Sequence, residues 1–262
     1  MHSFARVTEA VREAGILAKR NQSSVSVRRK EDGSVVTEMD LEIERRLSAL
    51  IHQEFPQANI ISEEYPTDFR AGRSLNFTID PIDGTDSYSQ GMPGWCVGVG
   101  ILDGSLSPVG GFVFAPRWGK DADRGVFLQA LPDQEPYWEG LPDLNPEKTP
   151  FEGHQLMIGS KVHRRFDFSS YPGKVRNVGS SIIHILSPII HNDVEGTFVP
   201  PSYIWDIVPA HGIARRFNLC LEYANKEEID YAPLVHRQIA AHHIVCGGDR
   251  AIENIRSHLR QL

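Results

Sequence analysis

The feature that most constrains the fold is a short acidic turn, Asp80-Pro81-Ile82-Asp83-Gly84-Thr85, directly after an apolar segment. The preceding residues 76–79 are typical of a buried strand, which places Asp80 at its carboxyl end. Pro81 fixes its own φ and biases Asp80 toward an extended conformation, while Asp83-Gly84 permits a sharp turn. Two carboxylates on such a turn can bind one hard cation, and Mg²⁺ prefers oxygen ligands. The sequence therefore predicts a magnesium site at the end of this strand.

The residues from Gly84 onward indicate the start of a helix. The unpaired N–H groups and partial positive charge of a helix start suit a phosphate. Carboxylates for a cation followed at once by an anion-binding helix start are what phosphoryl transfer needs. Taken alone, a turn after a strand with Thr85 and Asp86 as a helix cap explains the same residues equally well.

Two other interpretations of short motifs in this sequence are less consistent with its residues. Phosphatases of the haloacid-dehalogenase type carry Asp-x-Asp-Gly-Thr, and aligning Asp83-Gly84-Thr85 on that pattern puts Pro81 in place of the nucleophilic aspartate. Proline has no nucleophilic side chain, so this mechanism fails. Gly98, Gly100 and Gly104 lack the spacing of a dinucleotide-binding loop, and strand packing explains them better.

Composition narrows the partners and the compartment. The formal net charge of −7 provides no basic field for nucleic acid or anionic lipid. Cys96, Cys220 and Cys246 are far apart and lack CxxC spacing, which argues against disulfides or structural zinc and favours a reducing compartment. No signal peptide is recognisable, and no segment approaches the roughly 18 apolar residues of a membrane span. We therefore expect a cytoplasmic protein that binds neither nucleic acid nor membranes.

Apolar periodicity predicts mixed helices and strands without an internal repeat. The expected helices are residues 4–19, a helix beginning after Thr37, residues 180–191, residues 207–217 and a last helix from Ala251. The expected strands are residues 60–61, 75–79, 96–102, 109–114, 126–129, 156–158, 197–199, 219–223 and 239–245. A proline-rich connection at residues 131–153 separates an α+β half, residues 1–150, from an α/β half, residues 151–262, in one compact unit. Elements in this order indicate an α+β or layered α/β fold.

Four motifs in a fixed order resemble those of the inositol monophosphatase superfamily. The acidic turn matches the family's Asp-Pro-(Ile/Leu)-Asp-Gly-Thr, and residues 34–40, 61–64 and 205–206 are similar to its Val-Thr-x-x-Asp, Gly/Ser-Glu-Glu and Trp-Asp motifs. The resemblance covers nearly the whole chain. It implies an α+β fold of the layered α/β/α/β/α type shared with fructose-1,6-bisphosphatase, magnesium dependence, inhibition by lithium and a homodimer.

The resemblance assigns metal ligands residue by residue. A first Mg²⁺ would be bound by Glu63, Asp80 and the carbonyl oxygen of Ile82. A second would be bound by Asp80, Asp83 and Asp206. Two or three ions are expected, and Mn²⁺ can substitute. The resemblance also implies a catalytic role for Glu63.

The resemblance also implies which groups meet the water and the substrate. Thr85, with Asp40, would orient or deprotonate the attacking water. The backbone amides of Gly84 and Thr85 would hold the phosphate. Gly179-Ser180-Ser181 and Lys30 would lie on the substrate side.

Each of these residues also has an ordinary structural explanation. Asp40 and Asp206 suit the first turn of a helix, and Gly179-Ser180-Ser181 suits a plain N-cap. Glu63 suits a solvated strand end, and Trp205 is expected to pack in the core. The joint occurrence of four motifs favours the catalytic interpretation.

The substrate side departs from the family pattern. Family members usually place a glutamate seven residues before the Trp-Asp aspartate, where it contacts inositol hydroxyls, and here that residue is Val199. Valine accepts no hydrogen bond, so selectivity for inositol phosphate is not expected. We predict hydrolysis of a small-molecule phosphate monoester by in-line attack of water that Mg²⁺ activates. The alternatives are a 3′(2′),5′-bisphosphate nucleotidase, a fructose-1,6-bisphosphatase-like enzyme, a histidinol-phosphate phosphatase and a non-catalytic metal-binding relative.

Overall fold

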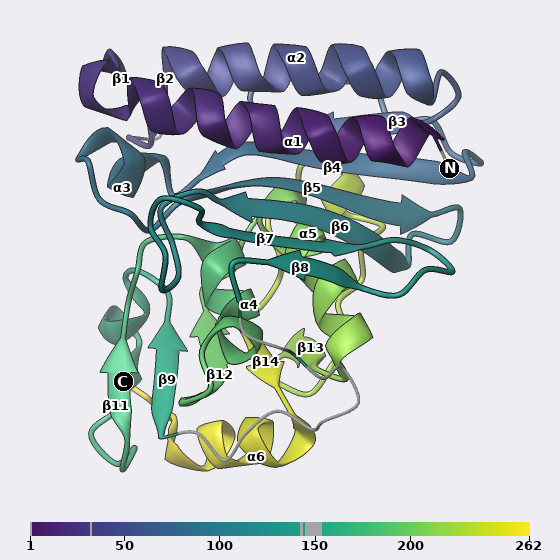
Figure 1. Ribbon diagram of the computed structural model, residues 1–262. Helices are drawn as coiled ribbons and strands as arrows, with labels where there is room; N and C mark the ends of the chain where they lie inside the picture. The colour runs from purple at the N-terminus through teal and green to yellow at the C-terminus, as the bar shows by residue number, and fades with distance from the viewer. Residues whose placement is uncertain (1, 32, 142–143, 145–153) are drawn as a thin grey trace.

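Helices and sheets alternate in layers from the top to the bottom of Figure 1. The computed structural model describes residues 2–31, 33–141, 144 and 154–262. Two helices cover a large sheet, two further helices lie beneath it, and a smaller sheet with one last helix completes the stack. The predicted α/β/α/β/α sandwich is confirmed.

The outer layer consists of α1, His2–Asn21, and α2, Glu38–Glu54. The buried side chains of α1 recur at helical spacing and face the sheet: Val7, Val11, Ala14 and Ala18. α2 begins with a capping box in which the backbone N–H of Thr37 donates to Asp40 Oδ2 over 2.8 Å. The predicted helix start after Thr37 is confirmed, and the same cap fixes the position of Asp40.

The large sheet has the strand order β3-β4-β5-β6-β7-β8 in the described residues. Its strands are Asn59–Ser62, Leu75–Asp83, Cys96–Asp103, Pro108–Ala115, Val126–Ala130 and Tyr137–Glu139. β3 runs parallel to β4, and the other neighbours are antiparallel. Helices cover both faces, so β4 is buried along almost its whole length.

The central layer consists of α4, Ser181–Ile190, and α5, Ile204–Ala214. α5 lies against β5 and β6, which present glycines to it. A Cβ on Gly100 would lie 2.7 Å from the backbone nitrogen of Pro209. Glycine therefore lets the helix backbone approach the strand directly, and the strand-packing interpretation of Gly98 and Gly100 is confirmed.

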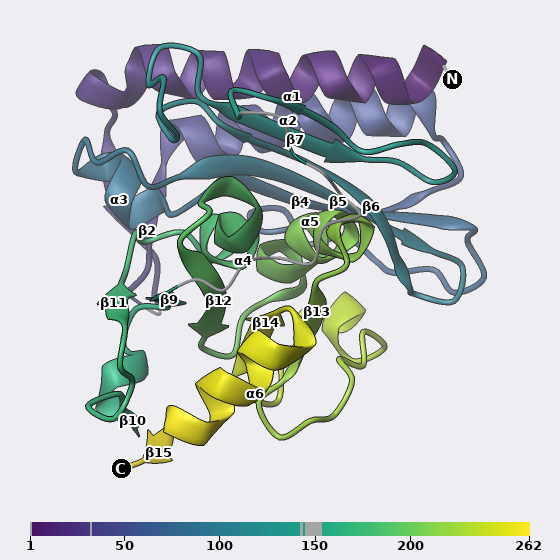
Figure 2. The same cartoon turned by 60° about the horizontal axis from the view of Figure 1, so that its bottom comes forward.

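The smaller sheet has the order β11-β9-β12-β14-β13. Its strands are, in that order, Lys174–Arg176, Gln155–Ile158, Val194–Val199, Ile244–Gly247 and Cys220–Tyr223. β9 is parallel to both of its neighbours, and the other two pairs are antiparallel. α6, Asp249–His258, covers the outer face of this sheet and comes forward in Figure 2.

Short elements complete the fold. β1, Val27–Arg29, and β2, Val35–Thr37, form a hairpin, and β10, Phe166–Asp167, pairs with β15, Arg260–Gln261. α3, Thr85–Ser89, follows β4 directly. Single 3₁₀ turns occupy Gln22–Ser24, Val162–Arg164, Arg215–Phe217 and Leu234–His236.

Two predicted boundaries are wrong. The strand expected at residues 239–245 begins only at Ile244, and Ile239 is 52% exposed in the preceding loop. The helix expected from Ile207 begins at Ile204, so the Trp-Asp motif lies inside its first turn. In the first case an apolar run without a strand partner resembled a strand.

Two further elements are longer or more regular than expected. β4 continues through the acidic turn to Asp83 instead of ending at Ile79. The connection at residues 131–153 contains β8, and residues 142–143 and 145–153 of it lie outside the described residues. The short strands β1, β2, β10, β11 and β15 carry too few residues for their periodicity to indicate them.

Replacing Gly100 by alanine should destabilise the protein by about 2–3 kcal/mol, the upper part of the usual range for overpacking. The new Cβ would lie 2.5 Å from Thr78 Oγ1 and 2.7 Å from the backbone nitrogen of Pro209, which cannot move without displacing α5. Urea denaturation followed by circular dichroism measures the loss. Gly104→Ala is the matched control, because its Cβ would lie 3.3 Å from the nearest atom. Equal losses for the two variants would contradict the packing argument.

Candidate metal centre

A bulge in β4 sets the direction of the two carboxylates of the acidic turn. Asp80 pairs with Gly98 and Asp83 pairs with Cys96, so three steps along β4 oppose two steps along β5. In a regular strand, residues three apart point to opposite faces of the sheet. The extra residue at Pro81-Ile82 removes this alternation, and a bulge tolerates a proline because one residue leaves the hydrogen-bond ladder.

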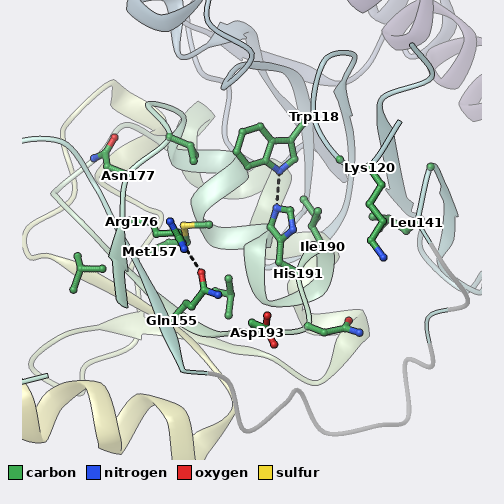
Figure 3. A pocket seen from close by; sticks show the side chains of 16 residues that line it. Trp118, Lys120, Leu141, Gln155, Met157, Arg176, Asn177, Ile190, His191 and Asp193 are labelled. Atoms are coloured by element: carbon green, nitrogen blue, oxygen red, sulfur yellow. Dashed lines mark hydrogen bonds between the residues drawn. The ribbon is translucent and has the colours of Figure 1, made fainter. Parts of the chain in front are cut away.

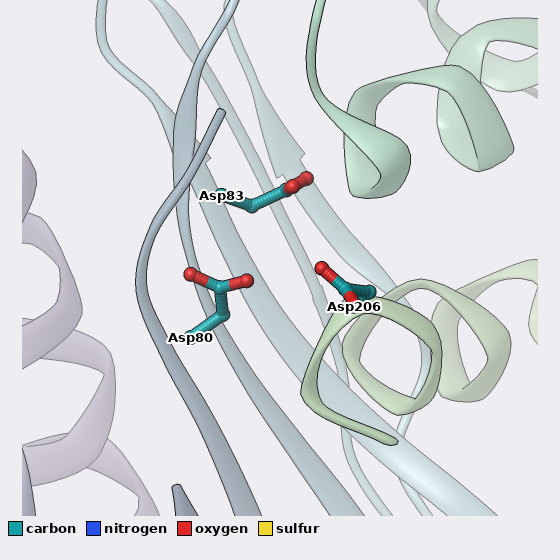
Figure 4. A group of neighbouring side chains, drawn as sticks. All are labelled: Asp80, Asp83 and Asp206. Atoms are coloured by element: carbon teal, nitrogen blue, oxygen red, sulfur yellow. The ribbon is translucent and has the colours of Figure 1, made fainter. Parts of the chain in front are cut away.

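Asp206 of α5 joins these two carboxylates. Oxygen atoms of Asp80, Asp83 and Asp206 all lie within 4.8 Å of one another (Figure 4). Asp206 Oδ2 accepts a hydrogen bond of 2.8 Å from the backbone N–H of Tyr203, at the start of the helix. The structure thus brings together two ligands predicted from one strand and one predicted from a distant helix.

Burial and mutual repulsion raise the pKa values of these carboxyls. Burial raises the pKa of Asp206 to about 7, and the charge of Asp83 adds to this effect. Burial also raises the pKa of Asp83 to about 6, against the hydrogen bonds that its carboxylate accepts. For Asp80, burial and then the charges of Glu63, Asp83 and Asp206 raise the pKa well above its ordinary value. A divalent cation is the partner that favours all three ionised forms.

The donor set fits Mg²⁺. The three side chains offer only carboxylate oxygens, which are hard ligands. Asp80 Oδ1 is buried, and no group within the described ranges donates a hydrogen bond to it. A buried carboxylate oxygen without a donor is expected where a cation completes its surroundings.

The first turn of α4 holds Asp83. Its Oδ2 accepts hydrogen bonds from the Ser180 hydroxyl over 2.5 Å and from the Ile182 N–H over 2.6 Å, and its Oδ1 accepts one from the Ser181 N–H over 3.2 Å. Ser180 is fully buried and is also the N-cap of the helix. In the segment predicted to face the substrate, Ser180 and Ser181 therefore contact a carboxylate of the protein, and Gly179 precedes them with a φ of 95°.

Asp40 and Thr85 meet beside the acidic turn. The Thr85 hydroxyl lies 3.1 Å from Asp40 Oδ1 and 2.9 Å from the carbonyl oxygen of Ile82. Burial raises the pKa of Asp40 to about 6, and hydrogen bonds from Thr37 oppose this rise. The two residues predicted to orient the water are in hydrogen-bond contact, and the carboxyl titrates close to neutral pH.

Glu63 and Lys30 form an ion pair next to this group. Lys30 Nζ lies 3.0 Å from Glu63 Oε1 and 2.6 Å from Glu64 Oε1. Burial lowers the pKa of Lys30, but the two carboxylates raise it by more. Glu63 does not belong to the group of three aspartates whose oxygens lie within 4.8 Å of one another. Its charge nevertheless raises the pKa of Asp80. The structure thus places Glu63 near the site without bringing it into the cluster.

Gly84 lies between β4 and α3, where the backbones of Gly94 and Gly179 approach it closely. It has a φ of 92°, which favours glycine, and a Cβ there would lie 2.7 Å from the carbonyl oxygen of Gly94. The N–H groups of the next residues, beginning with Thr85, have no acceptor within the helix because they lie in its first turn. The predicted helix start after the acidic turn is confirmed.

Glu44 shapes the site and was missed by the sequence analysis. It is fully buried on α2, and its carboxylate accepts hydrogen bonds of 2.7 Å from the N–H groups of Glu64 and Tyr65. Burial raises the pKa of Glu44. A signal for it exists, because Glu44 falls on the same helical face as the buried Leu47 and Ile51. A charged residue on an apolar face indicates a buried partner.

Val199 belongs to the core. It lies in β12 and is fully buried in the same hydrophobic cluster as Trp205, whose predicted core packing is confirmed. The position at which the resemblance implies a hydroxyl-binding glutamate therefore offers no polar group here. A glutamate at this position would bury a carboxylate.

A cavity of about 840 Å³ lies elsewhere in the molecule (Figure 3). Its wall includes Trp118, whose Nε1 donates a hydrogen bond of 2.9 Å to His191 Nε2. Burial lowers the pKa of His191, so its ring is neutral at pH 7. None of the aspartates of the metal group lines this cavity, but Asn177 and Val178 of its wall directly precede Gly179.

Comparison with known proteins decides the family. The sequence profile of the inositol monophosphatase family matches residues 2–261. The chain belongs to the inositol monophosphatase family. The prediction of an enzyme that hydrolyses phosphoric monoesters is confirmed by this match and by relatives that are named as phosphatases.

The relatives that match this chain are named after different enzyme activities. A Streptomyces griseus protein named glucose-1-phosphate thymidylyltransferase is 26% identical over 71% of each chain. A histidinol-phosphatase of Streptomyces coelicolor is 28% identical over 47% of this chain and 48% of its own length, so that match spans about half of the relative. The solved structure of the Thermotoga maritima IMPase has a TM-score of 0.77, 19% identity and 98% coverage of both chains. At this identity the structural likeness shows the fold alone.

In the metal-free protein, the Asp83 and Asp206 carboxyls should contribute less to stability as the pH rises from about 4 to about 7. Unfolded aspartates titrate near pH 4, whereas the folded pKa values of Asp83 and Asp206 are about 6 and about 7. Between these values each of the two carboxyls binds more protons in the folded state than in the unfolded state, so its contribution to the free energy of unfolding falls with rising pH. Mg²⁺ needs the ionised carboxylates, so it should raise the melting temperature more at pH 8 than at pH 5.

Thermal melts with EDTA or with MgCl₂ at the two pH values check this expectation. Asp206→Asn should shrink the difference between the two magnesium-induced shifts. Asp121→Asn is the control, because that side chain is 49% exposed in an ion pair with Arg124. Equal magnesium-induced shifts at both pH values for the unmodified protein would refute the linkage.

Proposed function

We propose that this family member hydrolyses the phosphate monoester of a small molecule in a magnesium-dependent reaction. The observation that carries the proposal is the convergence of three carboxylates, two of them buried and that of Asp206 partly buried, of which Asp80 has an oxygen without a donor in the described part of the chain. When bound, Mg²⁺ lowers the pKa of water and neutralises charge on phosphoryl oxygens.

The proposed ligands are oxygen atoms from four side chains and one carbonyl group. They are Glu63, Asp80, Asp83, Asp206 and the carbonyl of Ile82. The Ile82 oxygen lies 2.9 Å from the Thr85 hydroxyl, and a carbonyl oxygen with two lone pairs can accept that hydrogen bond and still coordinate a cation. For Glu63 to ligate an ion, its carboxylate exchanges Lys30 for the cation, which keeps its charge compensated. Two or three ions are proposed, with Mn²⁺ as a substitute.

Thr85 and Asp40 are the proposed proton-handling pair. The hydroxyl hydrogen of Thr85 points to Asp40 or to the Ile82 carbonyl, which leaves a lone pair on Thr85 Oγ1. That lone pair can accept a hydrogen bond from the attacking water and align it. Asp40, with a pKa of about 6, can take the proton through Thr85 at neutral pH.

Backbone groups are the proposed phosphate site. The amides of Gly84 and Thr85 lie at the start of α3, where N–H groups have no helical acceptor. Gly179 lies close to the same helix, since a Cβ on it would lie 2.0 Å from Ser87 Oγ. We place Gly179 on the substrate side and infer that Ser180 and Ser181 act on the substrate through Asp83. Lys30 remains the proposed cationic group on that side.

We propose a substrate whose binding does not require hydrogen bonds between its ring hydroxyls and a protein carboxylate. The buried Val199 supports this choice over a dedicated inositol phosphate substrate. Histidinol phosphate, fructose 1,6-bisphosphate and a 3′(2′),5′-bisphosphate nucleotide are the alternatives, and a relative named histidinol-phosphatase favours testing the first. In the described residues, no helix combines the length and apolarity needed to cross a membrane. Cytoplasmic location, lithium sensitivity and the homodimer stay predictions.

Asp80→Asn should lower kcat/KM by more than ~100-fold. Loss of a residue that only hydrogen-bonds to a metal ligand typically costs about 10–100-fold, and Asp80 is itself a proposed ligand. The amide keeps the shape of the side chain and removes the charge that holds the cation. Release of inorganic phosphate with and without MgCl₂ measures the effect, and circular dichroism checks the fold. Asp121→Asn, in an exposed loop pair, should keep full activity. Near-normal turnover of Asp80→Asn at saturating Mg²⁺ would sink the proposal.

Selectivity for inositol 1-phosphate should stay below ~100-fold relative to the alternative substrates. Phosphate and metal contacts are retained, while the contact that would read the ring hydroxyls is missing. The measurement is kcat/KM for inositol 1-phosphate, histidinol phosphate, fructose 1,6-bisphosphate and adenosine 3′,5′-bisphosphate under one set of conditions. A preference of ~100-fold or more for inositol phosphate, about 2.7 kcal/mol, would show that another side chain replaces the lost contact.

A further inference from the structure

The loop that carries Glu63 is held from two sides. Its N–H groups donate hydrogen bonds to β4 of the large sheet and to α2. The Glu63 N–H donates to the carbonyl oxygen of Ile79, and the N–H groups of Glu64 and Tyr65 donate to the Glu44 carboxylate. What remains to be satisfied are the carbonyl groups of the same loop.

Arg237 satisfies two of these carbonyl groups. Its Nη1 donates to the carbonyl oxygen of Ser62, and its Nη2 donates to that of Glu63 over 2.7 Å. The same guanidinium lies over the ring of Trp205, with 4.7 Å from Cζ to the ring centroid. One planar group therefore contacts the backbone of one proposed ligand and the side chain directly before another, Asp206.

The segment around Arg237 is itself anchored. Arg237 has a left-handed backbone with a φ of 62° at the end of the 3₁₀ turn Leu234–His236, and its N–H donates to the carbonyl of Leu234. Beyond it, the N–H of Ala240 donates over 2.9 Å to the carbonyl of Ser202, close to the start of α5. These contacts keep the guanidinium in a fixed place relative to α5.

We propose that Arg237 is a positioning residue that sets where Glu63 lies relative to Asp206, and thereby the affinity of the site for its divalent cation. This inference rests on the proposed magnesium dependence. The planar fork of arginine can serve two adjacent carbonyl groups and stack on an aromatic ring at once. A lysine ammonium keeps the charge but does not combine these two contacts. Arg237 touches neither the reacting atoms nor a carboxylate ligand, so it acts through the loop and through Trp205.

Arg237→Lys should weaken Mg²⁺ binding about tenfold, within the range expected for a partner that orients a metal ligand. Calorimetric titration of the metal-free protein with MgCl₂ measures this directly, and the magnesium-dependent shift in melting temperature is a second readout. Turnover at saturating Mg²⁺ should fall less than the affinity does. Arg124→Lys is the matched control, since Arg124 is 83% exposed and pairs with Asp121 in a surface loop. It should bind Mg²⁺ like the unmodified protein.

A double-mutant cycle tests whether Arg237 works through Glu63. In a Glu63→Gln background, Arg237→Lys should change Mg²⁺ affinity by less than ~2-fold, because the ligand that it positions is gone. An equal tenfold loss in both backgrounds, or no loss in either, overturns the proposal. If Arg237→Lys melts so early that binding cannot be measured, Trp205→Phe, which keeps a ring but shortens the stacking surface, should give a smaller loss in the same direction. Absence of Mg²⁺ binding by the unmodified protein would instead refute the proposed function.

Discussion

Repulsion between closely spaced carboxylates is the constraint on which the rest of the site depends. Asp80 and Asp83, which are buried, and Asp206, which is partly buried, bring oxygens within 4.8 Å of one another, and two unit charges about 4 Å apart interact by roughly 4 kcal/mol at an effective dielectric constant of 20. The fold relieves part of this cost, because the first turn of α4 donates to Asp83 and the start of α5 donates to Asp206. Asp80 receives no comparable help at its Oδ1 from the described residues. Protons at low pH or a cation at neutral pH can relieve the remainder, and only the second state leaves the three carboxylates ionised.

The chain builds this arrangement with backbone devices. The bulge turns Asp80 and Asp83 to one side of β4, and the start of α5 supplies Asp206 between the layers. The hydrogen bonds from Ser180 and Ile182 to Asp83 also join the large sheet to the central helices. Contacts that position the ligands are therefore the same contacts that hold two layers together. A substitution at Ser180 would act on the metal centre and on the packing of α4 at once.

The sequence predicted the parts of the fold and site that are encoded locally. The cap formed by Thr37 and Asp40 and the helix start at Gly84 each depend on neighbouring residues, and the structure has both. Asp206 was found only through the order of the family motifs, since nothing in its neighbours indicates proximity to Asp80. Glu44 and Arg237 reach their partners across the fold, so one left only a weak signal and the other none. The continuation of β4 to Asp83 was missed because Pro81 indicates a strand end unless a bulge is foreseen.

The groups proposed for the reaction and those proposed for substrate recognition also differ in how firmly the fold fixes them. The groups proposed to bind the cation and the phosphate are fixed by a bulge, helix starts and close glycine contacts, which leave little room for change. The groups proposed to read the rest of a substrate are single side chains, and one of them can differ without disturbing this framework. Val199 illustrates this, because it packs into the core of β12 while the three aspartates remain together. A framework of this kind keeps its reaction class while its substrate changes, and this is why membership of the inositol monophosphatase family establishes the chemistry more firmly than the identity of the phosphate ester.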